Sequence, residues 1–170
     1  MALLGDDEYF WEPVEGCWSV RRTENGTYLC DWAFPEPTPP PVTTIAWRLA
    51  HLATGVFGIR AANHFDSGPG TAWFTDGQPD FGKIPWPGSA ADALALVEKT
   101  HDAWVQGVRG LGEDGLSEPC GPSEGPFAQE PKATLVLHIN REAIHHAAEI
   151  ATLRDLYRMR STQPVGAGIT

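Results

Sequence analysis

Residues 132–160 read KATLVLHINREAIHHAAEIATLRDLYRMR, and this stretch decides the fold. It contains no Gly or Pro and is rich in residues of high helix propensity, so we predict one long helix. At about 100° per residue, its apolar side chains gather on one face of that helix, which we expect to pack against a core. This apolar stripe consists of Leu135, Ile139, Ala143, Ile150, Leu153 and Tyr157.

Two polar residues fall inside or beside this apolar stripe. Glu142 and His146 are four residues apart, so their side chains project from the same face of the helix. Burying a carboxylate or an imidazole without a partner is costly, and a divalent metal is one partner that suits both. The alternative is an ordinary hydrogen-bonded pair at the edge of the core. His138 and Glu149 flank the pair as candidate hydrogen-bond partners, whereas His145 points toward the edge of the stripe.

Composition excludes several classes of function. The chain has 170 residues with 22 acidic and 12 basic side chains, and its length fits a single domain spanning residues 1–170. The formal net charge is −10 and no basic cluster is present, so the sequence lacks the positive charge that nucleic-acid binding requires. No run approaches the roughly 20 apolar residues that a membrane span requires. The three cysteines are widely spaced without a CxxC motif, which favours a reducing cytoplasm.

A second helix is predicted from an N-cap at Thr43 or Thr44 to about Asn63. His51 lies on the shoulder of its apolar stripe, and periodicity alone does not distinguish a ligand from a structural histidine there. The stripe consists of Ile45, Leu52, Val56 and Ile59.

A third helix is predicted from about Ala90 to Arg109, because Ser89 and Asp92 form a capping box. Its apolar residues alternate by three and four, which predicts a buried seam that includes His101. We weigh three roles for His101, namely a metal ligand, a hydrogen-bonded core residue and a substrate contact. The seam consists of Ala90, Leu94, Val97, His101, Trp104, Val108 and Leu111.

The remaining segments read as loops. Residues 1–10 have room for at most a turn or two of helix, and residues 11–42 predict an aromatic-rich loop with a short hairpin at Asn25-Gly26. Its aromatic side chains either pack the loop or line the mouth of a pocket. Residues 64–88 and 110–131 are further loops rich in Gly and Pro. Three long helices joined by long loops predict an all-α bundle.

Three stretches together resemble the DinB-like superfamily of metalloenzymes. They are EYFWEPVEGCWSVR at 8–21, PPPVTTIAWRLAHLA at 39–53 and HINREAIHHAAEIATLRDLYR at 138–158. The last two are most similar to an actinobacterial branch that contains mycothiol transferases. The resemblance implies a four-helix bundle that holds a divalent metal, although only about seven residues precede the first stretch, where relatives have a complete helix. A short or missing first helix would leave apolar helix faces uncovered, and either a homodimer or another element of the chain is expected to cover them.

The resemblance also implies a ligand set, namely His51, Glu142 and His146. Three protein ligands leave an open coordination position, as in catalytic sites. The expected metal is zinc, with nickel or iron as alternatives. The implied activity is transfer of a low-molecular-weight thiol such as mycothiol to a small electrophile, or a related isomerisation or elimination. The alternatives are a metal-binding stress-response or interaction module without turnover, and a helical interaction module that holds no metal.

Further residues are expected around such a site. Arg48, Arg141 or Arg154 is expected to hold a carboxylate of the thiol or of the substrate. Trp47 and Trp104 are expected pocket walls, and His138 and Glu149 are also expected to be substrate-binding residues. His101 is the expected catalytic proton carrier.

Overall fold

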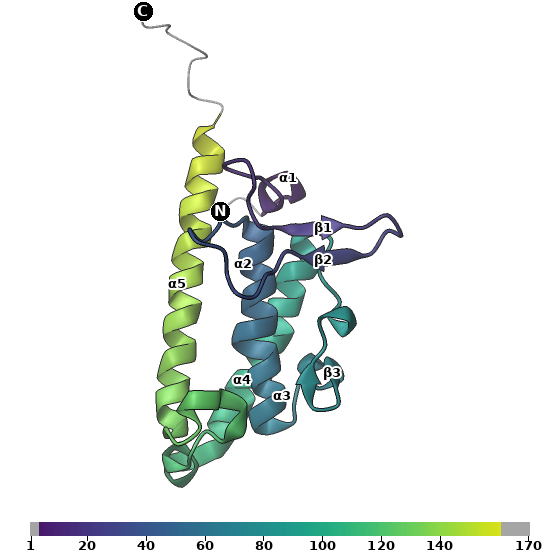
Figure 1. Ribbon diagram of the computed structural model, residues 1–170. Helices are drawn as coiled ribbons and strands as arrows, with labels where there is room; N and C mark the ends of the chain where they lie inside the picture. Colours follow the sequence, from purple (N-terminus) through teal and green to yellow (C-terminus); the bar gives the residue numbers. More distant parts are fainter. Residues whose placement is uncertain (1–3, 161–170) are drawn as a thin grey trace, which may run out of the picture.

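The framework of the protein is a set of three long helical rods, seen in a computed structural model that describes residues 4–160 (Figure 1). The first rod is continuous and comprises α2 (Ile45–His51), the π-helix η1 (Leu52–Gly58) and α3 (Ile59–Phe65). The other two rods are α4 (Ala90–Ser117) and α5 (Lys132–Met159). The prediction of an all-α bundle is confirmed. Among the described residues, no helix is both long enough and apolar enough to cross a membrane.

The α2–η1–α3 rod is the centre of the core. Between residues 43 and 58, every residue is buried except Arg48, His51 and Gly55. These three are spaced by three and four residues, so they share one face of the rod. On the other faces, alanines such as Ala50 and Ala53 are fully buried and let α4 approach closely. The one face that is not closed by packing is therefore the face that carries His51.

The start of this rod agrees with the prediction of an N-cap. The Thr44 hydroxyl accepts a hydrogen bond from the Trp47 backbone N–H at 3.2 Å. The π-helix begins directly after His51, and such insertions are frequent at functional sites. The rod ends where Asp66 adopts a left-handed conformation with φ 47°.

The predicted seam of α4 is wrong at two positions. Leu94 is 46 % exposed and His101 lies on the surface, whereas Ala93 and Thr100 are buried. Both registers have the same three-and-four spacing, so the sequence pattern fits either of them. The small side chains at 93 and 100 face η1 because they permit close helix packing. The helix also continues to Ser117, eight residues beyond its predicted end, with a non-helical kink at Gly112.

The short helix allowed near the N-terminus is the single turn α1 (Asp6–Tyr9). Tyr9 is fully buried, and its hydroxyl donates to the carbonyl of Pro87 at 3.1 Å. Asp6 accepts a hydrogen bond from the backbone N–H of Ala90 at 2.8 Å. These bonds tie α1 to the start of α4.

The loops carry two small antiparallel hairpins. The expected turn at Asn25-Gly26 joins β1 (Val20–Arg22) to β2 (Tyr28–Cys30), with Gly26 at φ 86°. The second hairpin pairs β3 (Phe74–Thr75) with β4 (Gln78–Pro79). Short 3-10 helices complete the loops, namely η2 (Pro69–Ala72), η3 (Phe81–Lys83) and η4 (Pro122–Phe127).

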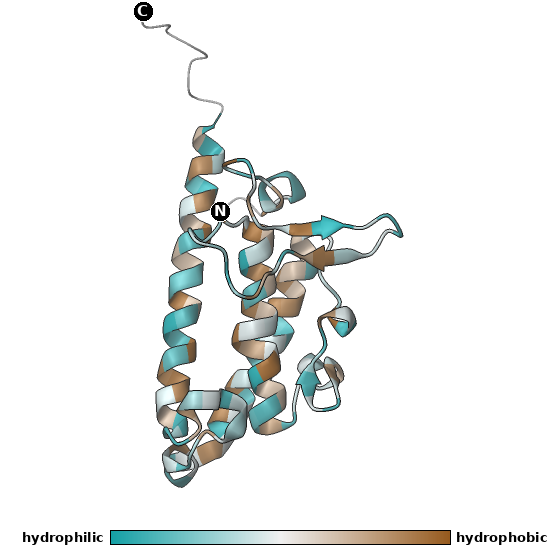
Figure 2. Ribbon diagram, in the orientation of Figure 1, coloured by the Kyte–Doolittle hydropathy of each residue, from teal (hydrophilic) through white to brown (hydrophobic). Residues whose placement is uncertain are grey.

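Helix α5 turns the predicted stripe toward the core, with three of its six residues buried and three half-buried, and exposes its opposite face. Leu135, Ile139 and Leu153 are buried, whereas Leu137 and Ile144 are 71 % and 72 % exposed. Figure 2 shows α5 as mostly hydrophilic with separate hydrophobic positions, in contrast to the rod behind it. Uncovered apolar side chains are thus present on α5, while the homodimer stays a prediction.

Candidate metal centre

The structure brings His51, Glu142 and His146 together from two elements. His51 is the last residue of α2, and the other two lie one turn apart on α5. The ring centroids of the two histidines are 4.8 Å apart, and the ring planes are nearly perpendicular at 87°. Nε2 of His146 lies 3.7 Å from Oε2 of Glu142. The two imidazoles are thus in contact, and the Glu142 carboxylate lies beside His146 where α5 meets the first rod.

The other nitrogen of His146 is held by an acid. Nδ1 of His146 lies 2.8 Å from Oε2 of Glu149, while Nη1 of Arg48 lies 3.3 Å from the same nitrogen. A carboxylate only accepts and a guanidinium only donates, so the closer, charged carboxylate places the proton on Nδ1. Nη2 of Arg48 in turn pairs with Oε1 of Glu149 at 3.0 Å. The lone pair of His146 therefore lies on Nε2, the atom that faces Glu142.

This Nε2 atom is a buried acceptor without a partner. It is buried, and no hydrogen-bond partner is found for it among residues 4–160. Glu142 at 3.7 Å is too far for a hydrogen bond. Two ligand atoms that share a tetrahedral zinc ion, each at about 2.1 Å, lie roughly 3.4 Å apart. The spacing of His146 and Glu142 therefore fits a shared metal ion better than it fits a direct contact.

His51 is prepared as a neutral ligand. Its ring stacks on Trp47 at 5.1 Å with an interplanar angle of 12°. Burial, followed by the proximity of His146, lowers the pKa of His51 to about 4. The imidazole is therefore uncharged near neutral pH and has a free lone pair. A Cβ added at Gly55 would lie 3.2 Å from the His51 ring, so a glycine here leaves the ring room against the π-helix.

A second acidic and histidine-containing cluster lies beside the first. Ligand atoms of His145, His146 and Glu149 all lie within 4.8 Å of one another. In that cluster, however, Glu149 is already in contact with Arg48 at 3.0 Å, His145 at 3.2 Å and His146 at 2.8 Å. The His145 side chain is 61 % exposed. The occupied carboxylate fits the role of an outer hydrogen-bond partner better than that of a ligand.

The sequence profile of the DinB superfamily matches residues 1–150 of the chain. The chain belongs to the DinB superfamily. The matched range includes all three converging residues. Neither the curated proteins nor the solved structures contain a significant match.

The arginines expected to bind a carboxylate are differently placed in this DinB superfamily chain. Arg48 is committed to Glu149, as described above. Nε of Arg154 pairs with Glu8 of α1 at 2.8 Å, which joins α1 to α5. Arg141 is exposed and lies 2.9 Å from Nδ1 of His138.

Two expected pocket residues lie elsewhere. His101 is exposed rather than buried, and its ring meets Phe57 at 5.1 Å and Asp102 at 3.7 Å. Trp104 is only 3 % exposed and packs against Phe65 in the core, and it is absent from the linings of the three cavities described below. The proton-carrying role of His101 stays a prediction that this geometry does not favour.

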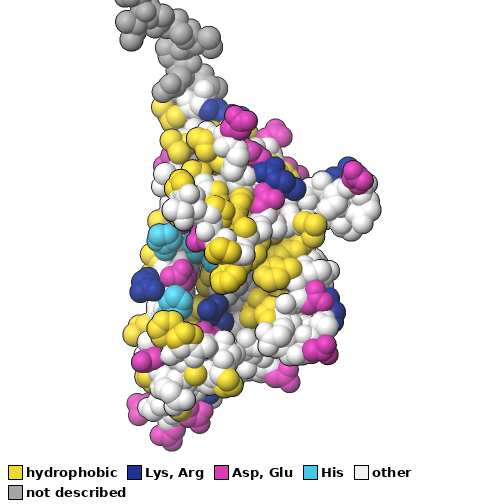
Figure 3. All heavy atoms as spheres, in the orientation of Figure 1, with side chains coloured by type: hydrophobic (Ala, Val, Ile, Leu, Met, Phe, Trp, Pro, Cys, Tyr) yellow, Lys and Arg dark blue, Asp and Glu magenta, His cyan; other side chains and the backbone are white. Residues whose placement is uncertain are grey.

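A cavity of about 260 Å³ opens on the His51 side of the centre. We call it the aromatic cavity, because four of its side chains are aromatic besides His51. It is lined by Cys30, Trp32, Trp47, His51, Thr54, Gly55, Ile59, Arg60, Phe81 and Trp86. Figure 3 shows hydrophobic side chains gathered beneath the β1–β2 hairpin, beside histidine and charged side chains over α5.

Arg60 was not expected from the sequence, although it lies between two cavities near the centre. It lines the aromatic cavity and also a cavity of about 780 Å³, whose walls include His138 and Arg141. Nη2 of Arg60 lies 3.5 Å from Glu124, whose other oxygen lies 2.9 Å from Nε2 of His64. The only hint in the sequence was the position of Arg60 on the same helix as His51. Its partner Glu124 comes from a loop that is distant in the sequence.

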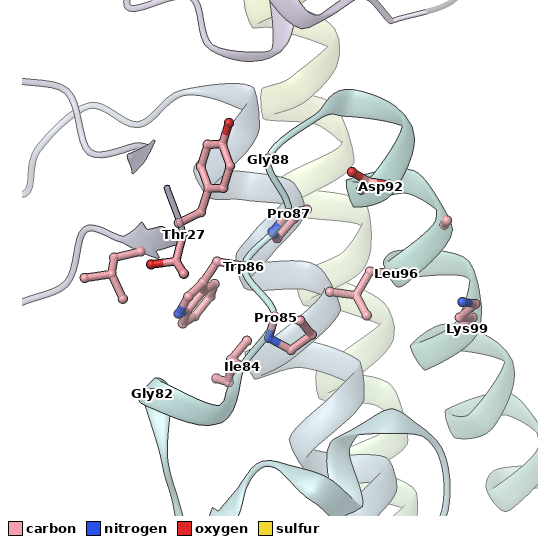
Figure 4. A pocket seen from close by; sticks show the side chains of 13 residues that line it. Thr27, Gly82, Ile84, Pro85, Trp86, Pro87, Gly88, Asp92, Leu96 and Lys99 are labelled. Carbon is pink, nitrogen blue, oxygen red and sulfur yellow. The ribbon is translucent and has the colours of Figure 1, made fainter. Parts of the chain in front are cut away.

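A third cavity, of about 580 Å³, lies away from the histidines (Figure 4). It is formed by the β1–β2 hairpin, residues 82–88 and the first turns of α4, and its charged side chains are Asp92 and Lys99. Trp86 lines this cavity as well as the aromatic cavity, so its indole lies between the two spaces. The described lining of the third cavity contains neither histidine nor cysteine.

Proposed function

We propose that His51, Glu142 and His146 bind a divalent metal and that the protein is a metal-dependent enzyme. The observation that carries the proposal is the buried Nε2 of His146, which has its lone pair free and Glu142 3.7 Å away. A cation there removes the cost of a buried acceptor without a partner. It also adds a positive charge beside the Glu142 carboxylate, whose other oxygen lies 3.5 Å from Arg141 and 3.8 Å from His138.

Zinc is the expected metal, with nickel or iron as alternatives. Two neutral imidazoles and one carboxylate form a donor set that is typical of catalytic zinc sites with an open position. Such a metal would supply Lewis acidity and lower the pKa of a thiol that reaches it.

The chain's own residues supply orientation. Glu149 holds the proton of His146 on Nδ1, and Arg48 holds Glu149. Trp47 fixes the plane of His51. These contacts are the outer hydrogen bonds and packing that maintain ligand geometry, and their loss typically weakens metal binding.

The proposed reaction is transfer of a low-molecular-weight thiol, such as mycothiol, to a small electrophile. The resemblance to the actinobacterial branch supports this choice of co-substrate. The aromatic cavity supports a small-molecule substrate, because a ligand within it lies against His51. Polar groups of the thiol would find His138 and Arg141 in the larger cavity. The alternative is a metal-binding stress-response or interaction protein without turnover.

Elemental mass spectrometry of the purified protein tests the metal. We expect about one equivalent of metal per chain, lost in His51→Ala and in His146→Ala. The matched control is His145→Ala, which removes a histidine from the neighbouring cluster and should retain the metal. If His145→Ala lost the metal and His51→Ala retained it, the ligands would instead be His145, His146 and Glu149.

A thiol-transfer assay then tests turnover. The metal-loaded protein is incubated with mycothiol and a panel of small electrophiles, and product is measured against the His146→Ala variant. Metal binding without product above that variant would favour the non-catalytic alternative.

A further inference from the structure

The walls of the aromatic cavity present ring faces rather than polar atoms. Nε1 of Trp47 donates to the carbonyl of Asp31 at 2.8 Å, and Nε1 of Trp86 donates to the carbonyl of Phe81 at 3.1 Å. The polar atoms of both indoles are therefore engaged with the backbone. The Thr54 hydroxyl is likewise engaged, since it donates to the carbonyl of Ala50 at 2.8 Å.

The rings at the mouth of the cavity form a stack. Trp32 and Phe81 are stacked at 6.0 Å and 27°, and Phe81 and Trp86 at 6.1 Å and 14°. Trp32 and Phe81 are 54 % and 46 % exposed, whereas Trp86 is 8 % exposed. The first two rings thus lie at the entrance and the third forms an inner wall. Such spacings are those at which aromatic rings attract one another, so a planar ligand finds matching partners.

The cavity is close to neutral. Arg60 is the one ionised side chain in its described lining. It pairs with Glu124 at 3.5 Å and donates from Nη1 to the carbonyl of Gly55, while its buried Nε has no hydrogen-bond partner among the described residues. Burial raises the pKa of the Cys30 thiol to about 12, so this thiol stays protonated. An anion that enters would lose its hydration and meet only a cation whose charge Glu124 already balances, which is unfavourable.

The volume sets the size of the occupant. About 260 Å³ lies just below the roughly 300 Å³ at which pockets for drug-sized ligands begin. A single ring fits such a space better than a fused or linked pair of rings.

We propose that the aromatic cavity binds an uncharged, planar group of single-ring size on the electrophilic substrate and holds it beside His51. The inference rests on the proposed function for the position of this ring near a metal. The binding of the ring itself requires only the cavity walls, so it is testable without the metal.

Benzamide and benzoate are a matched pair of probes, because they share a ring and a shape but differ in charge. Each is titrated into the full chain in the presence of a chelator, and the indole N–H signals are followed by nuclear magnetic resonance. Benzamide should shift a subset of the seven tryptophan signals, and benzoate should bind about tenfold more weakly. Absence of benzamide binding, or equal or tighter binding of benzoate, would overturn the inference.

Two phenylalanine variants locate the binding. Phe81→Ala removes a ring at the mouth and should weaken benzamide binding about two- to tenfold. Phe127→Ala is the control, because this residue is 66 % exposed and lines the larger cavity instead. Equal effects of the two substitutions would overturn the assignment to the aromatic cavity.

The two proposals fail in distinguishable ways. Benzamide binding with this pattern in a protein that takes up no metal would refute the metal chemistry and leave the cavity assignment standing. A metal-loaded protein that does not bind benzamide would refute only the cavity assignment.

Discussion

Replacing Glu149 by Gln tests whether this acid prepares His146 for the metal. The carboxylate accepts from Nδ1 of His146 at 2.8 Å and pairs with Arg48 at 3.0 Å. An amide of the same shape keeps the packing but can donate as well as accept, so it no longer fixes the proton on Nδ1. The share of His146 with a lone pair on Nε2 should therefore fall.

Loss of such an outer partner typically lowers metal affinity about 10- to 100-fold, which corresponds to roughly 1.4 to 2.7 kcal/mol. The cost in folding should be smaller, because the Glu149 and Arg48 side chains are 31 % and 19 % exposed and solvent screens their pairing. We expect about 1 kcal/mol or less from the lost ion pair, a shift of roughly 2–4 °C or less in Tm.

The assay is a competition titration of zinc against a chromophoric chelator, with Tm measured on the same samples by circular dichroism. Glu142→Gln is the comparison, because it replaces a proposed ligand and should lower zinc affinity further than Glu149→Gln does. Parent-like zinc affinity in Glu149→Gln would refute the reasoning. So would a greater loss in Glu149→Gln than in Glu142→Gln, since Glu149 would then be acting as a ligand itself.

Three further predictions concern the surroundings of the site. Gly55→Ala places a Cβ 3.2 Å from the His51 ring, which Trp47 restrains, so zinc affinity should fall. The Tm should stay equal or rise, because Ala favours a helix more than Gly does. The same titration and melt measure both, and unchanged zinc affinity would show that the ring has room to move. The hydrogen bond from His64 holds the pKa of Glu124 below its usual value of 4.5, so the stability from this carboxylate is present above that pH and lost as the pH falls through the lower folded-state pKa. Glu124→Gln should lower neutral-pH stability by about 1–3 kcal/mol and flatten the acid side of the Tm-against-pH curve, and an unchanged curve would contradict this. Thr44→Ala removes the N-cap of α2 and a hydrogen bond to Ser19 at 2.9 Å, which should cost about 1–2 kcal/mol in urea unfolding; a cost near zero would contradict the capping role.

Local patterns in the sequence predicted the helices and two of the three proposed metal ligands. The cap at Thr44, the cap at Ser89 and the full length of α5 follow from residues that interact within a few positions of one another. The pairing of Glu142 with His146 is of the same kind, because two side chains four apart on a helix are neighbours in any tertiary context. His51 required the family resemblance, since its own helix does not distinguish it.

Only the tertiary structure decided which residues of α4 are buried. The α4 pattern fits two registers, and the choice of Ala93 and Thr100 over Leu94 and His101 depends on how closely η1 approaches. The periodicity of a helix is visible in its own sequence, but which of two similar faces is buried depends on the shape of the neighbouring helix.

The aromatic cavity has the same origin. Trp32 and Phe81 lie far apart in irregular loops, and they meet because the loops fold over the open face of the α2–η1–α3 rod. The proton on His146 likewise depends on Glu149 and on Arg48 from the other rod. The sequence alone therefore determined the helices and the spacing of Glu142 and His146, because both follow from contacts within one segment. The fold alone decided the partners, the protonation and the cavity, because each requires side chains from separate segments to meet.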